Sequence, residues 1–375
     1  TLMRSSAASD VYKRQIKYGI TKRKGKYRHM SGDGRKKEIS GIRVLCIFLA
    51  FLIIALLLAG VKMIFRTEKS EQRIAGENGS WAEESIIIEN PTEKPVIKIK
   101  YPENPGNVTL FGGDIVSKAG VLINVSDNTI VAGRDENKII YPASMTKIMT
   151  LIVAAENISS LDDTFTMTHE ILEPLVDADA SRAGFEENET VTMEDMLYGA
   201  VLPSGADATV GLATAISGSE EGFVDLMNDK VSEMGLENTH FINTSGLHDK
   251  NHYSTPVEMA MIMEYAMKDE LCRKILSTYQ YTTSKTKEHP DGILLESTMF
   301  GRMYGDEVTG ALIEGGKTGY TDEAENCLAT FGTKGGKEYV SVTVLSYDYW
   351  LTIHDAFNIY ANYIEPKSEI IIKAE

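Results

Sequence analysis

Two residues near the middle of the chain, Ser144 and Lys147, have the types and spacing of a nucleophile and its base. They lie in Tyr141–Lys147, which reads YPASMTK. Residues three apart on a helix share one face, and Pro142 favours a helix that starts just after it. A serine hydroxyl attacks a carbonyl well only when a base removes its proton, and a lysine is a base only when neutral. Burial and a second cation both lower a lysine pKa.

Two later segments carry the residue types that would complete such a site. Leu202–Ala208 places Ser204 on a glycine-containing turn, where its hydroxyl can face a cleft. Glu314–Thr321 reads EGGKTGYT, and its glycines allow a close approach to a strand. Lys317 would be the second cation. Each of the three segments also has a purely structural interpretation: a surface helix start, a helix N-cap and a hairpin strand with a solvated lysine.

The surrounding pattern predicts an α+β fold. Apolar runs at 120–125 and 129–133, separated by turn residues, indicate a hairpin. Helical periodicity follows between 148 and about 280, with Thr192 as an expected N-cap. Strand-like runs return at 311–314, 327–331 and 339–345, and a closing helix is expected at 351–364. We therefore expect an antiparallel sheet built from both ends of the segment, flanked by helices, with a helical subdomain inserted.

In this order the three segments resemble the S-x-x-K, S-D-N and K-T-G motifs of the penicillin-recognising serine enzymes. Within that group the sequence is similar to the low-molecular-mass D-alanyl-D-alanine carboxypeptidases, over residues 115 to 365. The similarity includes further stretches: Val191–Gly199, Asn243–Leu247, His252–Thr255 and Asn326–Leu328. The resemblance implies a β-lactamase/DD-peptidase-like fold and a peptidoglycan stem peptide ending in D-Ala-D-Ala as substrate. It also implies inhibition by β-lactams, and it involves no cofactor.

The resemblance implies a role for each catalytic residue. Ser144 would attack the carbonyl of the penultimate D-Ala and form an acyl-enzyme. Lys147 would be the general base, and Ser204 would relay a proton to the leaving D-Ala. Water would then release the shortened peptide.

The resemblance also implies four substrate-binding residues, Lys317, Thr318, Gly319 and Tyr320. Lys317 would help to lower the pKa of Lys147, and Thr318 would hold the terminal carboxylate. The backbone N–H groups of Ser144 and Tyr320 would form an oxyanion hole.

One residue departs from the motif, because Ala206 stands where the family usually has Asn. The change removes a side-chain amide expected to bond Lys147 or the substrate. It leaves a catalytically silent cell-wall scaffold as an alternative function. A serine β-lactamase is another alternative, since Phe223–Asn228 partly resembles a deacylation segment. A transpeptidase or endopeptidase would share all the motifs.

A membrane anchor is expected at residues 44–65. Val44–Val61 contains no charged residue, which is close to the minimum for a spanning helix. Residues 1–43 hold 13 basic and 3 acidic residues, so this side is expected in the cytoplasm and the rest of the chain outside. A cleaved signal peptide is the alternative, but its apolar core would be shorter. We expect a single-pass protein of the cell membrane with an extracytoplasmic catalytic domain.

The remaining boundaries follow from composition. Residues 1–15 resemble translated sequencing-adapter read-through. We expect a linker at 66–105, the DD-peptidase catalytic domain at 106–365 and a tail at 366–375. Outside residues 1–43 the net charge is −26, because the whole chain is at −16 and that stretch at +10, which argues against nucleic acid as a partner.

Other residues that could carry chemistry are given structural interpretations. His248 and His252 fall in a loop, so no metal site is expected. Cys272 and Cys327 are expected to stay unpaired. The aromatic residues near the C-terminus, including Tyr347 and Tyr349, are expected to pack in the core or at a sheet edge.

Overall fold

The computed structural model describes residues 97–303, 308 and 310–364. The expected anchor at 44–65, the basic tail, most of the linker and the tail at 366–375 lie outside these residues. Within the described ranges, no helix is both long and apolar enough to cross a membrane.

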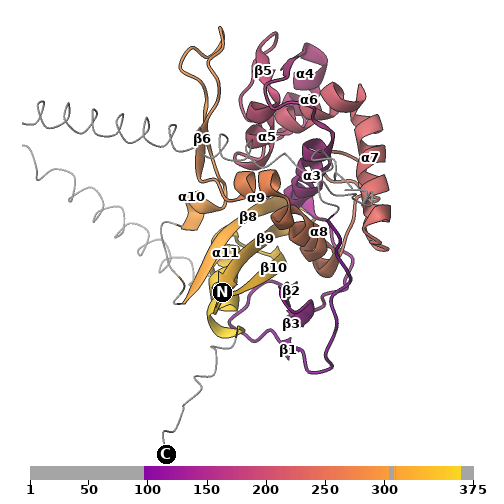
Figure 1. The fold of residues 1–375 in the computed structure, drawn as a ribbon, viewed down its shortest axis with the longest axis vertical. Coiled ribbons are helices and arrows are strands. Elements are labelled where there is room, and N and C mark those ends of the chain that lie inside the picture. The colour runs from indigo at the N-terminus through magenta and orange to yellow at the C-terminus, as the bar shows by residue number, and fades with distance from the viewer. Residues whose placement is uncertain (1–96, 304–307, 309, 365–375) are drawn as a thin grey trace, which may run out of the picture. The chain divides into compact units, whose positions relative to one another are not determined.

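A six-stranded sheet forms the base of the domain (Figure 1). Its strands are β1 (Thr109–Leu110), β2 (Ala119–Asn124), β3 (Thr129–Arg134), β8 (Ala311–Thr321), β9 (Glu325–Lys334) and β10 (Lys337–Ser346). Their order is β1-β3-β2-β10-β9-β8, so both ends of the domain sequence build one sheet, as predicted. The sheet is mixed rather than wholly antiparallel, because β1 pairs with β3 in parallel. The expected hairpin is β2–β3.

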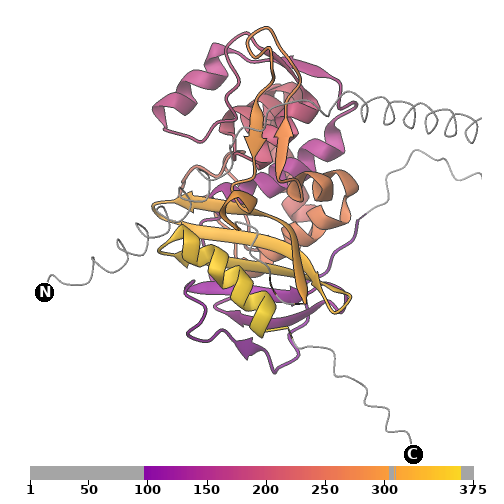
Figure 2. The ribbon, with the colours of Figure 1, turned by 90° about the vertical axis from the view of Figure 1, so that its left-hand side faces the viewer.

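Two helices cover the two faces of the sheet. Helix α11 (Tyr349–Asn362) lies across one face, as Figure 2 shows, and helix α8 (Pro256–Lys268) packs on the other. Alternation along the strands explains both layers. Val121 and Ile123 of β2 belong to the larger core with α8, whereas Leu122 packs with Tyr360 of α11. A strand buried on both faces is a nearly continuous apolar run, and all six residues of β2 are buried, with only the last of them, Asn124, carrying a polar side chain.

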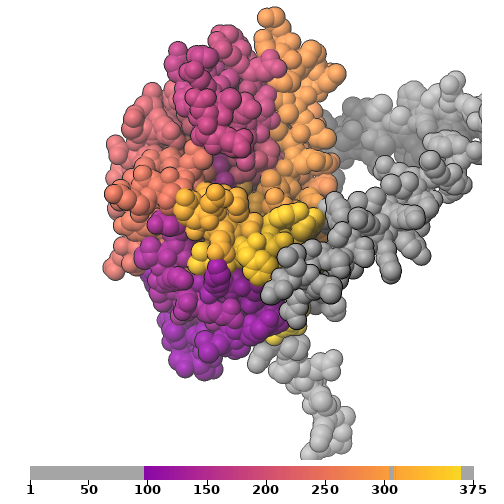
Figure 3. Space-filling model, turned by 180° about the vertical axis from the view of Figure 1, so that it is seen from behind, coloured from indigo at the N-terminus to yellow at the C-terminus, as the bar shows by residue number. Residues whose placement is uncertain are grey.

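The helical subdomain stands above the sheet. Its elements are the 3-10 helix η1 (Ala143–Thr146) and helices α3 (Lys147–Asn157), α4 (His169–Asp177), α5 (Met193–Val201), α6 (Ala206–Ser217), α7 (Glu220–Glu233) and α9 (Glu270–Leu276). The short helix α10 (Phe300–Met303) packs instead against α11. The predicted cap on α5 is present, since the Thr192 side chain accepts a hydrogen bond from the N–H of Asp195. Figure 3 shows the last strands meeting this subdomain along the middle of the molecule.

Two short ribbons were not anticipated from the sequence pattern. One pairs β4 (Thr164–Thr166) with β5 (Thr190–Thr192), and the other pairs β6 (Gln280–Thr282) with β7 (Leu294–Glu296). Strands of three residues are too short to show a period. The second ribbon rises beside α5 (Figure 1), where Tyr281 stacks on Tyr198 and donates to Asp195.

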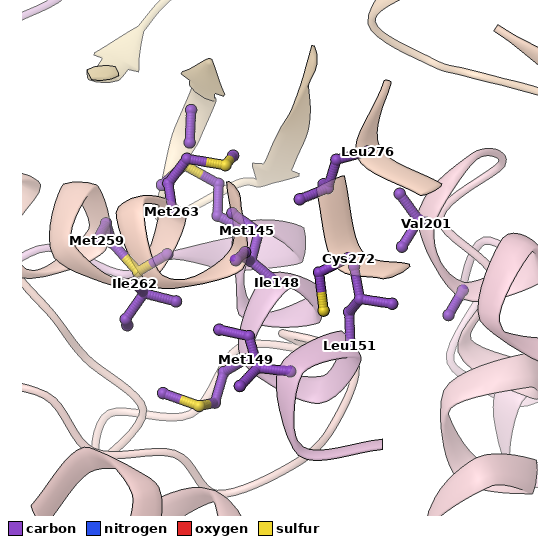
Figure 4. Close-up of a cluster of buried hydrophobic side chains, with 14 of the residues drawn as sticks. Met145, Ile148, Met149, Leu151, Val201, Met259, Ile262, Met263, Cys272 and Leu276 are labelled. Atoms are coloured by element: carbon purple, nitrogen blue, oxygen red, sulfur yellow. The ribbon is translucent and has the colours of Figure 1, made fainter. Parts of the chain in front are cut away.

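The core beneath the candidate site is rich in methionine. Met145 of η1 and Met149 of α3 lie near Met259 and Met263 of α8 and Cys272 of α9 (Figure 4). All five side chains are buried. Unbranched methionines fill irregular gaps between crossing helices, so η1 and α3 rest on a fully packed base.

The domain begins earlier than residue 106. Ile97 and Ile99 pack against the main core, and the Tyr101 hydroxyl donates to the buried carboxylate of Glu258 at 2.6 Å. The last residues of the predicted linker are therefore attached to helix α8.

Candidate active site

Ser144 and Lys147 are brought together at the junction of η1 and α3. The Nζ of Lys147 lies 3.1 Å from the Oγ of Ser144, within hydrogen-bond distance. The chain enters this junction through Ala143, which has a positive φ of 47°. Such a conformation costs free energy in a residue with a Cβ and is often found at functional sites. The predicted pairing of the two residues on one helical turn is therefore present, with a 3-10 turn in place of the expected α-helical start.

Two glycines allow other segments to reach the backbone of Ser144. A Cβ on Gly319 of β8 would lie 3.2 Å from the backbone nitrogen of Ser144. A Cβ on Gly246 would lie only 1.9 Å from the carbonyl oxygen of Ala143, and Gly246 has a φ of +85°. Gly246 therefore requires glycine, and a side chain at Gly319 would press its neighbours apart by a few tenths of an ångström. The approach of Gly319 also brings its neighbour Tyr320 to the nucleophile.

Lys147 is a base candidate because of its burial. Its side chain is 2% exposed, and burial lowers its pKa to about 7, against the opposing charges of Asp207 and Glu220. Near neutral pH a substantial fraction of this lysine is uncharged and can accept a proton. A second partner, the carbonyl oxygen of Ser245, lies 2.6 Å from its Nζ.

Ser204 and Lys317 form the second pair of the site. Lys317 donates to the Oγ of Ser204 at 3.0 Å and to the Thr318 carbonyl at 2.9 Å. Ser204 has a φ of +67°, so the predicted turn is strained and presents the hydroxyl. Lys317 is 1% exposed; burial, then the charge of Lys147, holds its pKa well below the ordinary range. The charge of Lys147 contributes to the lowered pKa of Lys317, whereas the pKa of Lys147 is lowered by burial and not, as expected, by Lys317.

A cavity of about 520 Å³ opens over these residues. Ser144, Ser204, Thr318, Gly319 and Tyr320 all line it, whereas Lys147 and Lys317 are buried beside it. The six predicted residues other than Gly319 thus supply a nucleophile, a buried base, a second serine–lysine pair, a threonine hydroxyl and an aromatic rim. Gly319 supplies the close approach.

Several residues that line the cavity were not predicted from the sequence. Thr298 shares a 2.7 Å hydrogen bond with the Thr318 hydroxyl, and Arg302 lies four residues later on the same wall. Arg302 stacks over the ring of Tyr349 at 5.1 Å. A threonine before a short helix and an arginine on it form no pattern that can be recognised in the sequence. They become part of the site because the folded sheet places Thr318 of β8 beside Thr298.

The C-terminal tyrosines are a correction to the sequence analysis. Tyr347 is 71% exposed and Tyr349 44% exposed, so neither is a core residue. Both line the cavity. The apolar composition of this stretch suggested packing, but β10 ends at Ser346 and α11 turns back immediately. The connection therefore leaves both rings at the rim.

Asp207 ties the start of α6, which follows the turn that carries Ser204, to the segment 183–185. Its buried carboxylate accepts hydrogen bonds from the backbone N–H groups of Ala183 (2.7 Å), Gly184 (3.0 Å), Phe185 (3.3 Å) and Ala208 (2.9 Å). The neighbouring Ala206 donates its own N–H to the Ser181 carbonyl at 2.7 Å. Its methyl group is buried and offers Lys147 no hydrogen bond.

The other sequence candidates take structural positions. His252 is buried, with its pKa lowered to about 4 chiefly by burial, and its ring bonds to Thr146 at 2.7 Å. Cys272 and Cys327 are separate buried thiols. Asn228, in the segment compared with a β-lactamase, bonds both the N–H and the carbonyl of Phe241. Among the described residues no cluster of His, Cys, Asp or Glu could hold a metal.

Comparisons with known proteins agree with this geometry. A family model described as D-alanyl-D-alanine carboxypeptidase, peptidase S11, matches residues 104–347. D-alanyl-D-alanine carboxypeptidase DacF of Bacillus subtilis is 33% identical over 228 residues, which are 60% of this chain and 56% of that protein. DacA of Haemophilus influenzae is 31% identical over 61% of this chain and 57% of that protein. The chain thus spans little more than half the length of these two relatives.

Solved structures show the same similarity. A Streptomyces DD-transpeptidase superposes with a TM-score of 0.61 at 29% identity, over 68% of this chain and 98% of that one. Penicillin binding protein 5 of Haemophilus influenzae gives a TM-score of 0.60 at 27% identity, over 67% of this chain and 71% of that one. The α+β arrangement of mixed sheet and helices is therefore the fold of these peptidases.

Proposed function

Because the chain belongs to the D-alanyl-D-alanine carboxypeptidase family of serine peptidases, we propose that it removes the terminal D-Ala from peptidoglycan stem peptides. The observation that carries the proposal is the 3.1 Å contact between Lys147 Nζ and Ser144 Oγ, at a lysine whose burial lowers its pKa to about 7. A buried lysine that is uncharged in a substantial fraction of molecules near neutral pH can take the proton of a serine.

The reaction has two steps. In acylation, the Ser144 proton passes to Lys147 as Oγ bonds to the carbonyl carbon of the penultimate D-Ala. The C–N bond then breaks, and the leaving D-Ala amine takes a proton relayed by Ser204. In deacylation, water adds to the ester, the shortened peptide leaves with a new carboxylate, and Ser144 regains its hydrogen. The position of Ser204, whose Oγ already accepts from Lys317 at 3.0 Å, supports the relay.

The cavity suggests how the peptide is held. Thr318, supported by Thr298, would bind the terminal carboxylate, close to the amine of Lys317. The backbone N–H groups of Ser144 and Tyr320 would stabilise the oxyanion, a role supported by the close approach of Gly319 to the first of them. A β-lactam would acylate Ser144 by the same route.

The proposal extends to location. The basic stretch at 1–43 and the uncharged run at 44–61 support a single-pass anchor with the catalytic domain outside the cytoplasm. An enzyme held there would meet its substrate in the cell wall. Labelling of engineered cysteines at positions 20 and 90 by a membrane-impermeant thiol reagent in whole cells, in a Cys46→Ser background, tests this topology. Only position 90 should react.

Intact-mass spectrometry of the full chain with benzylpenicillin tests the chemistry, with Ser144→Ala as the control. We expect an adduct of one penicillin on the wild type and none on the variant, together with release of D-Ala from a peptide ending in D-Ala-D-Ala. An intact antibiotic and no adduct would favour a silent scaffold. Rapid hydrolysis of the penicillin would favour a β-lactamase. An adduct without D-Ala release would favour a transpeptidase or endopeptidase.

A further inference from the structure

The acceptor that orients Lys147 comes from a part of the chain far from all three motifs. Ala206 offers no side-chain oxygen, and the carbonyl of Ser245 lies 2.6 Å from Nζ instead. Ser245 is 4% exposed, so water does not compete freely for this contact. A buried lysine keeps one orientation only if its N–H groups find fixed acceptors. The orientation of Lys147 therefore depends on how firmly this carbonyl is held.

Asn243 builds the turn that presents this carbonyl. Its Oδ1 accepts from the N–H groups of Ser245 (3.2 Å) and Gly246 (2.7 Å), and its Nδ2 donates to the Leu247 carbonyl at 2.9 Å. Such side-chain bonds to the following backbone define an Asx turn. Asn243 thus determines the direction of the peptide unit between Ser245 and Gly246.

Glu220 holds the same turn from the other side. Its Oε1 accepts from the N–H (2.9 Å) and from the hydroxyl (2.7 Å) of Thr244. The Thr244 carbonyl in turn accepts from Thr150, which lies three residues after Lys147 on α3, at 2.7 Å. The turn is therefore tied to the helix that carries the base. On its far side, Gly246 is pressed against Ala143.

We propose that Asn243 and Glu220 are positioning residues for acylation, because they fix the carbonyl oxygen that orients the lysine base. The turn takes over the acceptor role that a side-chain amide at position 206 would have. The inference rests on the proposed function of Ser144 and Lys147. It explains how the site stays assembled although the middle motif has lost its amide.

The charges around Lys147 make this testable by pH. The groups that face it are Asp207 of α6 and Glu220 of α7, both acidic, Lys317 of β8, and the ring of His252. Glu220→Gln retains an oxygen for Thr244 but removes one negative charge that favours the protonated lysine. We expect the acid limb of the acylation–pH profile to move to lower pH. Glu221→Gln, an exposed neighbour, matches the change in net charge and should leave the limb in place.

A rescue experiment tests the turn. Asn243→Ala should slow acylation of Ser144 by benzylpenicillin about tenfold or more, since the carbonyl loses its fixed direction. Ala206→Asn in that background should recover part of the rate by returning an amide to the lysine. Asn228→Ala is the matched control, because Asn228 makes two backbone bonds to Phe241 but none to the turn at 243–247. Its acylation rate should stay within about twofold of the wild type.

The outcomes separate this inference from the proposed function. No adduct on the wild type would refute the proposed function itself. A normal wild-type adduct, with an unmoved limb in Glu220→Gln and no recovery in the Asn243→Ala, Ala206→Asn pair, would overturn the inference alone. Glu220→Ala, which removes both bonds to Thr244, is the second variant: slower acylation supports the inference and a wild-type rate overturns it, even if Asn243→Ala fails to fold.

Discussion

Lys317 donates a hydrogen bond to Ser204, with 3.0 Å between Nζ and Oγ, although the two residues lie 113 positions apart in the chain. The bond joins β8, an edge strand of the sheet, to the turn before α6. It therefore connects the sheet to the helical subdomain beside the cavity. Each residue reaches it from a strained or glycine-rich segment, which accounts for the unusual backbone at both places.

Lys147→Met should remove the base that takes the proton of Ser144, while the new side chain has a similar shape. We expect acylation of Ser144 by benzylpenicillin to fall by about 10² to 10⁴-fold, the usual contribution of general base catalysis. Thermal unfolding would show that the protein still folds. Acylation at the wild-type rate would mean that another group takes the serine proton.

The pH dependence of acylation follows from the same lysine. With a pKa of about 7, Lys147 is protonated and inactive below neutral pH. The rate of adduct formation should therefore rise about tenfold per unit below pH 7 and level off above it. Rates measured from pH 5 to 9 by rapid-quench mass spectrometry will show this. A flat profile would contradict the assignment of the base.

The titration of Lys147 should also make the free energy of unfolding increase with pH. The pKa of Lys147 is about 7 in the folded protein and 10.5 in its ordinary state, so between these values the unfolded chain binds more protons. Its contribution to the free energy of unfolding therefore rises with pH from 7 to 10.5 and is lost as pH falls through 7. Compared with Lys147→Met, the wild type should gain stability between pH 7 and 10 in urea titrations. Parallel curves would argue against a shifted pKa.

Gly246→Ala should destabilise the protein more than the same substitution at a positive-φ glycine in open space. Its new Cβ would collide with the Ala143 carbonyl, and we expect a loss of at least roughly 3 kcal/mol of stability together with slower acylation. Gly235→Ala is the matched control: Gly235 has a φ of +69° but open space around it. It should cost about 1 to 2 kcal/mol, the price of the conformation alone. Equal losses in urea unfolding would show that the close approach is unimportant.

Asp207→Ala should release the start of α6 from the segment 183–185. Removal of the carboxylate leaves buried N–H groups, including that of Ala183, without an acceptor, at a cost of roughly 3 kcal/mol or more. Asp225→Ala, an exposed acid on α7, serves as the control and should change stability by less than about 0.5 kcal/mol. Chemical unfolding of both variants measures the difference. An Asp207→Ala protein as stable as its control would refute this anchoring role.

Much of the local structure was predictable, because it depends on neighbours within about one turn. Thr192 caps α5 through a contact three residues away, and Pro256 begins α8 as its fixed φ favours. Alternation and turn residues identified β2 and β3. The same local logic failed for the three-residue ribbons and for β1, whose parallel pairing depends on a partner more than twenty residues away.

The sequence by itself determined which residue types could do the chemistry and in which order they occur: a serine and lysine one turn apart, a second serine, and a lysine–threonine pair on a strand. Only the tertiary structure decided their distances, the burial that lowers the pKa of Lys147, and the replacement of the missing amide by the Ser245 carbonyl. It alone placed Thr298, Arg302 and Tyr347 at the cavity. The reason is physical. Residue type and near spacing are written along the chain, whereas desolvation and contacts between distant segments arise only when packing brings those segments together.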